Sequence, residues 1–100
     1  MKILAIEREV PGITDHEFEP HLQQEAAKVW ELHQAGVFRE LYFRNDQASA
    51  VLILECSDTE EANQTLQTLP LVKEGLITFE VIPLKAYPGF SRLFANEAKS

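Results

Sequence analysis

The chain has 100 residues, enough for one domain but too few for two separate hydrophobic cores. Hydrophobic residues make up 45% and charged residues 25%, as in ordinary globular proteins and unlike disordered or repetitive chains. Nine Lys and Arg against sixteen Asp and Glu give a formal net charge of -7. This charge argues against binding to nucleic acids and to anionic membrane surfaces.

The single cysteine, Cys56, rules out a disulfide within this sequence and suits a reducing compartment. Glu7 and Arg8 interrupt the first apolar run, which is therefore unlike a signal peptide. A membrane-spanning helix needs about 20 consecutive apolar residues, and no stretch of this sequence comes near that length. We therefore predict a cytoplasmic location.

Residues 2 to 9 alternate in two apolar rows, Ile3 with Ala5 and Leu4 with Ile6, which predicts a strand that is apolar on both faces. Two later segments, residues 37 to 44 and 49 to 56, are rich in aromatic or β-branched side chains and predict a hairpin. Residues 77 to 84 alternate again and predict a fourth strand.

Two helices are expected between these strands. Thr14 and Glu17 have the spacing of a capping box, so the first helix should begin near residue 15 and run to Gly36. Ser57 and Glu60 repeat that spacing and predict a second helix, which Pro70 would terminate.

The order βαββαβ predicts an α+β, ferredoxin-like domain with a four-stranded antiparallel sheet over residues 1–88, followed by a C-terminal tail at 89–100. Two helices can cover only one face of this sheet, yet both faces are apolar. The uncovered set is either Leu4/Ile6 with Leu52/Leu54 and Ile82/Leu84, or Ile3/Ala5 with Val51/Ile53 and Ile77/Phe79/Val81. Such a patch predicts a homodimer whose sheets pack face to face.

Residues 36 to 42 (GVFRELY), 66 to 71 (LQTLPL) and 79 to 84 (FEVIPL) together resemble the muconolactone isomerase family. Residues 66 to 71, LQTLPL, and residues 79 to 84, FEVIPL, are similar to the end of its second helix and to its last strand. Residues 36 to 42, GVFRELY, are similar to its Gly-x-Trp-Arg-x-Leu-Trp motif, and Glu25 falls on a glutamate of its first helix. The resemblance implies a dimeric α+β barrel, further stacking into ring-shaped oligomers, and a cofactor-independent proton shift in an unsaturated lactone that bears a carboxylate.

The chain also departs from the family pattern. Phe43 stands where the family has a second arginine, and the basic residue Arg44 comes one step later. Phe38 and Tyr42 replace tryptophans, and Tyr87-Pro88 replaces His-Pro. The identity of the substrate therefore does not carry over.

Glu25 is the candidate catalytic base and acid, because it lies on the shoulder of the apolar helical face, where partial burial would raise its pKa. The alternative is a carboxylate that reaches solvent or pairs with Lys28 or His21. His21 could relay a proton, although helix histidines near the surface are commonly idle.

Arg39 could hold a substrate carboxylate, or it could form a structural pair with an acidic residue on a neighbouring strand. The candidate partners are Glu7, Glu9, Glu55 and Glu80. Tyr42 and Tyr87 could donate a hydroxyl to an enolate, or they could pack at a dimer seam. These groups would meet in a pocket between the sheet and the first helix.

No cofactor and no metal ion are expected. The three histidines, His16, His21 and His33, lack the i, i+4 spacing of a helical metal site, and there is no glycine-rich phosphate loop. The main hypothesis is an isomerase-like enzyme that takes a small acid or lactone. The alternatives are a non-catalytic oligomeric module that binds a small molecule, and a cofactorless monooxygenase.

Overall fold

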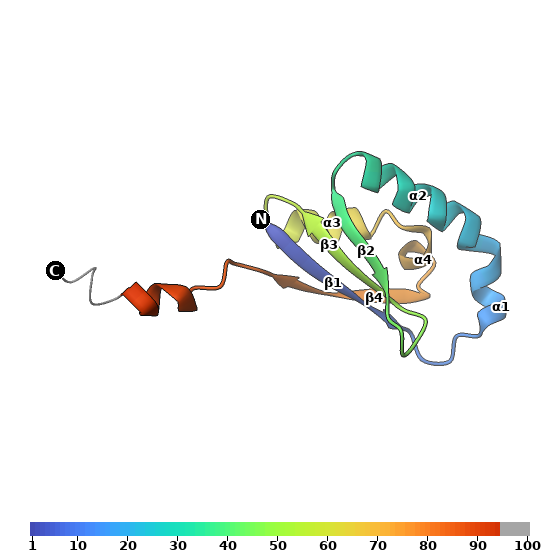
Figure 1. The fold of residues 1–100 in the computed structure, drawn as a ribbon. Coiled ribbons are helices and arrows are strands. Elements are labelled where there is room, and N and C mark those ends of the chain that lie inside the picture. The colour runs from blue at the N-terminus through green and yellow to red at the C-terminus, as the bar shows by residue number, and fades with distance from the viewer. Residues whose placement is uncertain (95–100) are drawn as a thin grey trace.

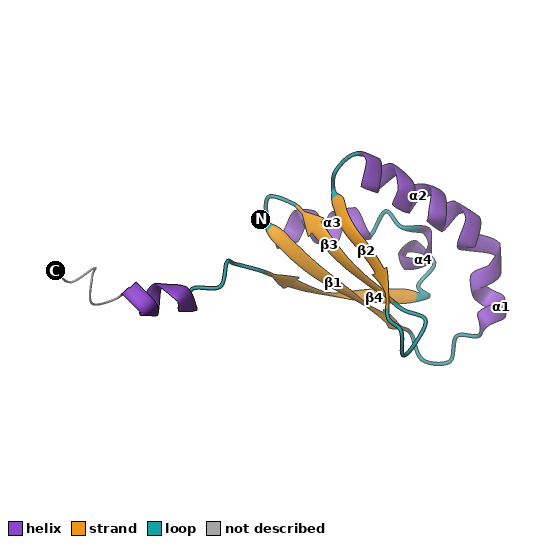
Figure 2. Ribbon diagram, viewed as in Figure 1, coloured by secondary structure: helices purple, strands orange, loops and turns teal. Residues whose placement is uncertain are grey.

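One antiparallel sheet of four strands, in the order β2-β3-β1-β4, forms a layer of the computed structural model, which describes residues 1–94. Its strands are β1 (Lys2–Glu9), β2 (Phe38–Phe43), β3 (Ala50–Glu55) and β4 (Ile77–Pro83). The helices lie against one face of the sheet (Figures 1 and 2). This arrangement confirms the predicted α+β, ferredoxin-like order.

The first helical segment is interrupted, where the sequence predicted one continuous helix. It consists of α1 (Asp15–Phe18), the 3₁₀ turn η1 (Glu19–His21) and α2 (Leu22–Gln34). The break coincides with Pro20, which has no N–H to donate and whose ring clashes with the preceding turn. The predicted capping box is present, since the Thr14 N–H donates to the Glu17 carboxylate across 2.9 Å.

The second helical segment starts and ends differently from the prediction. In α3 (Thr59–Leu66) the cap is Asp58, whose Oδ1 accepts from the Glu61 N–H at 2.8 Å, and not Ser57. Pro70 does not terminate this helix but opens a further one, α4 (Pro70–Lys73). Proline suits that first position because its nitrogen has no hydrogen to leave unpaired.

The strand register decides which apolar row faces the helices. Ala5 lies opposite Leu52, and Ile6 lies opposite Val51. Directly opposed residues share a face, so the helix side carries Ile3, Ala5, Leu52, Leu54, Ile77, Phe79 and Val81. The uncovered side carries the half-buried residues Leu4, Ile6, Val51, Ile53 and Ile82. Both predicted groupings placed the β3 residues on the wrong face of the sheet, because they assumed a register one residue away from the observed one. A one-residue slip moves every side chain of a strand to the other face.

The core lies between the sheet and the helices. Its largest fully buried side chains are Phe38, Ile3, Leu54, Leu69 and Ile77. Beyond β4 the chain leaves this body and ends its described part in the 3₁₀ helix η2 (Gly89–Phe94), which projects away from the sheet (Figure 1). Within residues 1–94, no helix is long and apolar enough for a membrane crossing.

The described part of the tail carries exposed apolar side chains. Phe90, Leu93 and Phe94 are exposed, and the ring of Tyr87 packs edge-on against Phe90 with centroids 5.1 Å apart. The rest of the predicted tail, residues 95–100, lies outside the described part of the chain.

Candidate functional site

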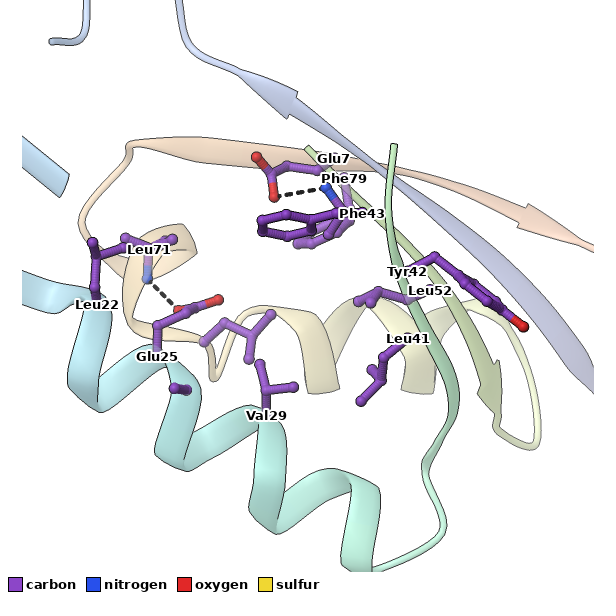
Figure 3. Close-up of a pocket in the computed structure, with 13 residues that line it drawn as sticks. Glu7, Leu22, Glu25, Val29, Leu41, Tyr42, Phe43, Leu52, Leu71 and Phe79 are labelled. Carbon is purple, nitrogen blue, oxygen red and sulfur yellow. Dashed lines mark hydrogen bonds between the residues drawn. The ribbon is translucent and has the colours of Figure 1, made fainter. Parts of the chain in front are cut away.

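A cavity of about 400 Å³ lies between α2 and the sheet, where the sequence predicted a pocket (Figure 3). Its volume is within the range typical of small-molecule sites. The helix supplies Leu22, Glu25, Ala26 and Val29. The strands supply Glu7, Leu41, Tyr42, Phe43, Ala50, Leu52 and Phe79, and the segment around α4 adds Leu69 and Leu71. The walls are therefore mostly apolar, with two carboxyl groups among them.

Glu25 lines this cavity from the first turn of α2. Its Oε1 accepts a hydrogen bond from the Leu71 N–H at 2.9 Å. Leu71 lies in the first turn of α4, where backbone N–H groups have no partner inside the helix, and α4 has no side-chain cap of its own. Glu25 does not form the predicted alternative pair with Lys28, because the Lys28 ammonium binds Glu31 at 2.6 Å.

Glu7 is a second carboxyl group of the cavity, and it was not among the predicted site residues. It is only 8% exposed, and its Oε1 accepts from the Ala50 N–H at 3.2 Å. A signal for it was available, since Glu7 follows Ile3 and Ala5 in the same alternating row of β1. A carboxylate in a row that faces the core is rarely buried without a hydrogen-bond or charge partner, so it marks a candidate site residue.

Burial raises the pKa of both carboxyl groups. For Glu25, burial outweighs the hydrogen bond from Leu71, which acts in the opposite direction. For Glu7, burial likewise outweighs the hydrogen bond from Ala50, and the charges of Glu9 and Glu25 raise the pKa further. A raised pKa moves a carboxylate towards the range in which it can both accept and return a proton near neutral pH.

These shifts predict how stability depends on pH. The folded protein holds the two protons more tightly than the unfolded chain, so their contribution to stability is complete below the ordinary value of 4.5 and is lost as pH rises through the raised values. The double variant Glu7→Gln/Glu25→Gln should therefore gain stability relative to the wild type as pH rises. Urea unfolding between about pH 4 and pH 8 measures the difference. A difference that stays constant over this range would contradict the burial argument.

Arg39 lies outside the cavity because β2 is irregular between Phe38 and Glu40. Such a bulge sets two residues against one on the partner strand and breaks the alternation that had placed Arg39 beside Leu41 and Phe43. The Arg39 guanidinium donates to the carbonyl of Gly36. The pKa of Glu55 is lowered mainly by the hydrogen bond from the Met1 amino group, and the charge of Arg39 lowers it further.

Tyr42 borders the cavity, but its side chain points away from it (Figure 3). Its cross-strand partner is Val51, on the uncovered face of the sheet. The Tyr42 hydroxyl donates to the Glu40 carboxylate at 2.7 Å, and this bond raises the pKa of Tyr42. The hydroxyl therefore faces the uncovered side of the sheet and not the cavity.

His21 and Tyr87 are not among the residues that line the cavity. His21 is half-buried at the start of α2, and Tyr87 is exposed in the segment that follows β4. Of the predicted site residues, the structure thus brings only Glu25 into the cavity with its functional group. Within residues 1–94, no cluster of three or more His, Cys, Asp or Glu side chains could hold a metal ion.

Two solved structures share this fold. A crystal structure of muconolactone isomerase superposes with a TM-score of 0.72 at 19% identity, over 88% of this chain and 92% of that chain. The 5-chloro-2-hydroxyhydroquinone dehydrochlorinase of Burkholderia phenoliruptrix, in complex with 2,5-dihydroxybenzoquinone, superposes with a TM-score of 0.64 at 18% identity, over 89% of this chain and 98% of that chain.

No protein of curated function matches this chain in sequence. The sequence profile of the muconolactone delta-isomerase family does match, and it spans residues 5–89. Since the match covers most of the chain, this protein belongs to the muconolactone delta-isomerase family.

Proposed function

We propose that this protein catalyses a cofactor-independent proton shift in a small unsaturated cyclic carbonyl compound, with Glu25 as base and acid. The main support is the Glu25 carboxyl group. It lines a mostly apolar cavity, and burial raises its pKa. Its Oε1 accepts from the Leu71 N–H, and within residues 1–94 no donor bonds to Oε2, which can meet a ligand. The family match supports the same reaction type.

In this reaction the Glu25 carboxylate removes a proton from the carbon beside the carbonyl group. The electron pair of the broken C–H bond moves into a dienolate. The same carboxyl group then returns the proton to the carbon two positions further along, and the double bond shifts without oxidation or reduction. The mostly apolar walls lower the polarity around the carboxylate, which strengthens its electrostatic interactions. The complex of the dehydrochlorinase with a benzoquinone supports a ring-shaped ligand in this fold.

A proton-exchange experiment tests the proposal. Dialysed full-length protein is incubated in deuterated water with 5-methyl-2(3H)-furanone, an unsaturated five-membered lactone. We expect deuterium to enter the ring, and the conjugated isomer to form, faster than in buffer alone, as followed by NMR. If neither occurs above the buffer rate for this lactone or for simple cyclic enones, the proposal fails.

A binding module without catalysis would be favoured by a cavity filled with aromatic side chains. Phe38 lies in the core, and Phe90 and Phe94 lie on η2, outside the residues that line the cavity. Phe43 lines the cavity but leaves its volume open. The filled cavity that would favour that alternative is therefore not seen among the described residues.

We also propose that two copies pack through the uncovered face of the sheet. In a single copy its apolar residues are only half-buried, and no helix of the described part of the chain lies over them (Figure 1). Stacking of such dimers into rings stays a prediction from the family resemblance.

Ile53→Glu should dissociate this dimer, because it places a charge in the middle of the apolar contact. Sedimentation at micromolar concentration should show twice the chain mass for the wild type and one chain mass for the variant. Gln23→Glu, which adds the same charge on exposed α2, is the control and should remain a dimer. A wild-type protein that sediments as one chain would contradict the face-to-face packing.

A further inference from the structure

The charged groups that line the cavity are both acidic. Glu7 enters from β1 and Glu25 from α2, and no basic residue of the described chain is part of the lining. Two arginines near the sheet are paired outside this lining. Arg8 pairs with Glu80 at 2.7 Å, and Arg44 pairs with Asp46 at 2.6 Å.

Glu7 is positioned to act on a ligand. Its side chain is more than nine-tenths buried and turns towards the helix side of the sheet (Figure 3). One oxygen accepts from the Ala50 N–H. No buried side-chain oxygen or nitrogen among the described residues lacks a hydrogen-bond partner, so the second Glu7 oxygen is not sealed off from open space. Glu7 lines the candidate cavity and also borders a second one beside Arg8 and Ser49. The neighbouring charge of Glu25 already raises the pKa of Glu7, which indicates that the two carboxyl groups repel each other when ionised.

A ligand carboxylate in this cavity would become a third acidic group, and no basic side chain of residues 1–94 lines the cavity to pair with it. Transfer of an unpaired carboxylate from water into an apolar site is strongly unfavourable. An uncharged ring avoids this penalty and still gains from the apolar walls formed by residues such as Leu52, Leu71 and Phe79.

We infer that the cavity selects an uncharged cyclic lactone or enone, and that Glu7 is the specificity residue that excludes the carboxylate-bearing counterpart. The inference deepens the proposed function, on which it rests for the reaction. It departs from the substrate that the sequence resemblance implies, because the expected anion clamp, Arg39, lies outside the cavity. The discrimination itself is a property of binding and can be tested without turnover.

The test compares two unreactive ligands that differ in one group. They are γ-valerolactone and the same saturated lactone with a carboxymethyl group in place of its methyl group. Dissociation constants are measured by NMR titration at neutral pH for the full-length wild type, Glu7→Gln and Glu7→Asp. Glu31→Gln, which removes one exposed charge from the same helix that carries Glu25, is the matched control.

We expect the wild type to bind the neutral lactone about tenfold or more tightly than the charged one, which is the effect of one like charge at close range. Glu7→Gln should reduce that ratio severalfold, whereas Glu7→Asp and Glu31→Gln should retain it. The inference is overturned if the charged lactone binds equally well or better, if neither ligand binds at millimolar concentration, or if folded Glu7→Gln keeps the full ratio. If Glu7→Gln does not fold, the ratio of the two dissociation constants in the wild type decides whether the cavity prefers the uncharged lactone. Absence of proton exchange together with a clear preference for the neutral lactone would reject the proposed reaction and retain this inference.

Discussion

Glu25→Gln is expected to lower the rate of lactone proton exchange by roughly 10²- to 10⁴-fold, the usual contribution of a positioned general base. Glutamine has almost the same shape as glutamate, and its side-chain oxygen can still accept from the Leu71 N–H. The start of α4 should therefore remain capped, and the loss of activity should reflect the missing basic group. The rate is measured by NMR in deuterated water under saturating lactone.

The matched control is Glu31→Gln, the same substitution on the same helix at an exposed site. It should leave the exchange rate within about twofold of the wild type, since an exposed ion pair contributes little to the fold. Far-UV circular dichroism and sedimentation should match the wild type for both variants. If Glu25→Gln retains full exchange activity while folded, Glu25 is not the base and the proposed mechanism is wrong.

Phe38→Ala is expected to reduce the free energy of unfolding by about 3–5 kcal/mol. Phe38 is fully buried and is the largest fully buried side chain among the described residues. Its removal would take away buried apolar area and leave a cavity that the surrounding sheet and helices cannot fully close. Because small domains are stable by only about 5–15 kcal/mol, this loss is a large fraction of the total. Urea unfolding monitored by circular dichroism gives the change.

Phe43→Ala provides the comparison for the same substitution in the same strand. Phe43 is 73% exposed, so its removal should change the free energy of unfolding by no more than about 0.5 kcal/mol. Equal effects of the two substitutions would show that the assignment of Phe38 to the core, and with it the irregularity of β2, is wrong.

The sequence predicts the elements of this fold better than their relative positions. Alternation and capping patterns are local, so the strands and the start of the first helix could be found from short segments. Register depends on contacts between distant segments, and the side of the sheet on which Leu52 lies could not be read from its own neighbours. The break at Pro20 was available in the sequence, since proline cannot continue a helical hydrogen-bond pattern.

The site was predicted in part for the same reason. Glu25 was found because its position on one helix is set by a local period of 3.6 residues. The alternation expected for β2 fails at the irregularity between Phe38 and Glu40, so Arg39 does not share the cavity side with Leu41 and Phe43. Glu7 was missed although the row of Ile3 and Ala5 leads directly to it, because it was considered only as a partner for Arg39.

The hydrogen bond from the Leu71 N–H to Glu25 couples the protonation of the proposed base to the packing of α4 against α2. A charged carboxylate accepts a hydrogen bond more strongly than a protonated one. In the proposed cycle, the hydrogen bond that holds α4 to α2 would be stronger while Glu25 is ionised and weaker while Glu25 is protonated. The hydrogen bond between α2 and α4 would therefore weaken and strengthen once in each turnover.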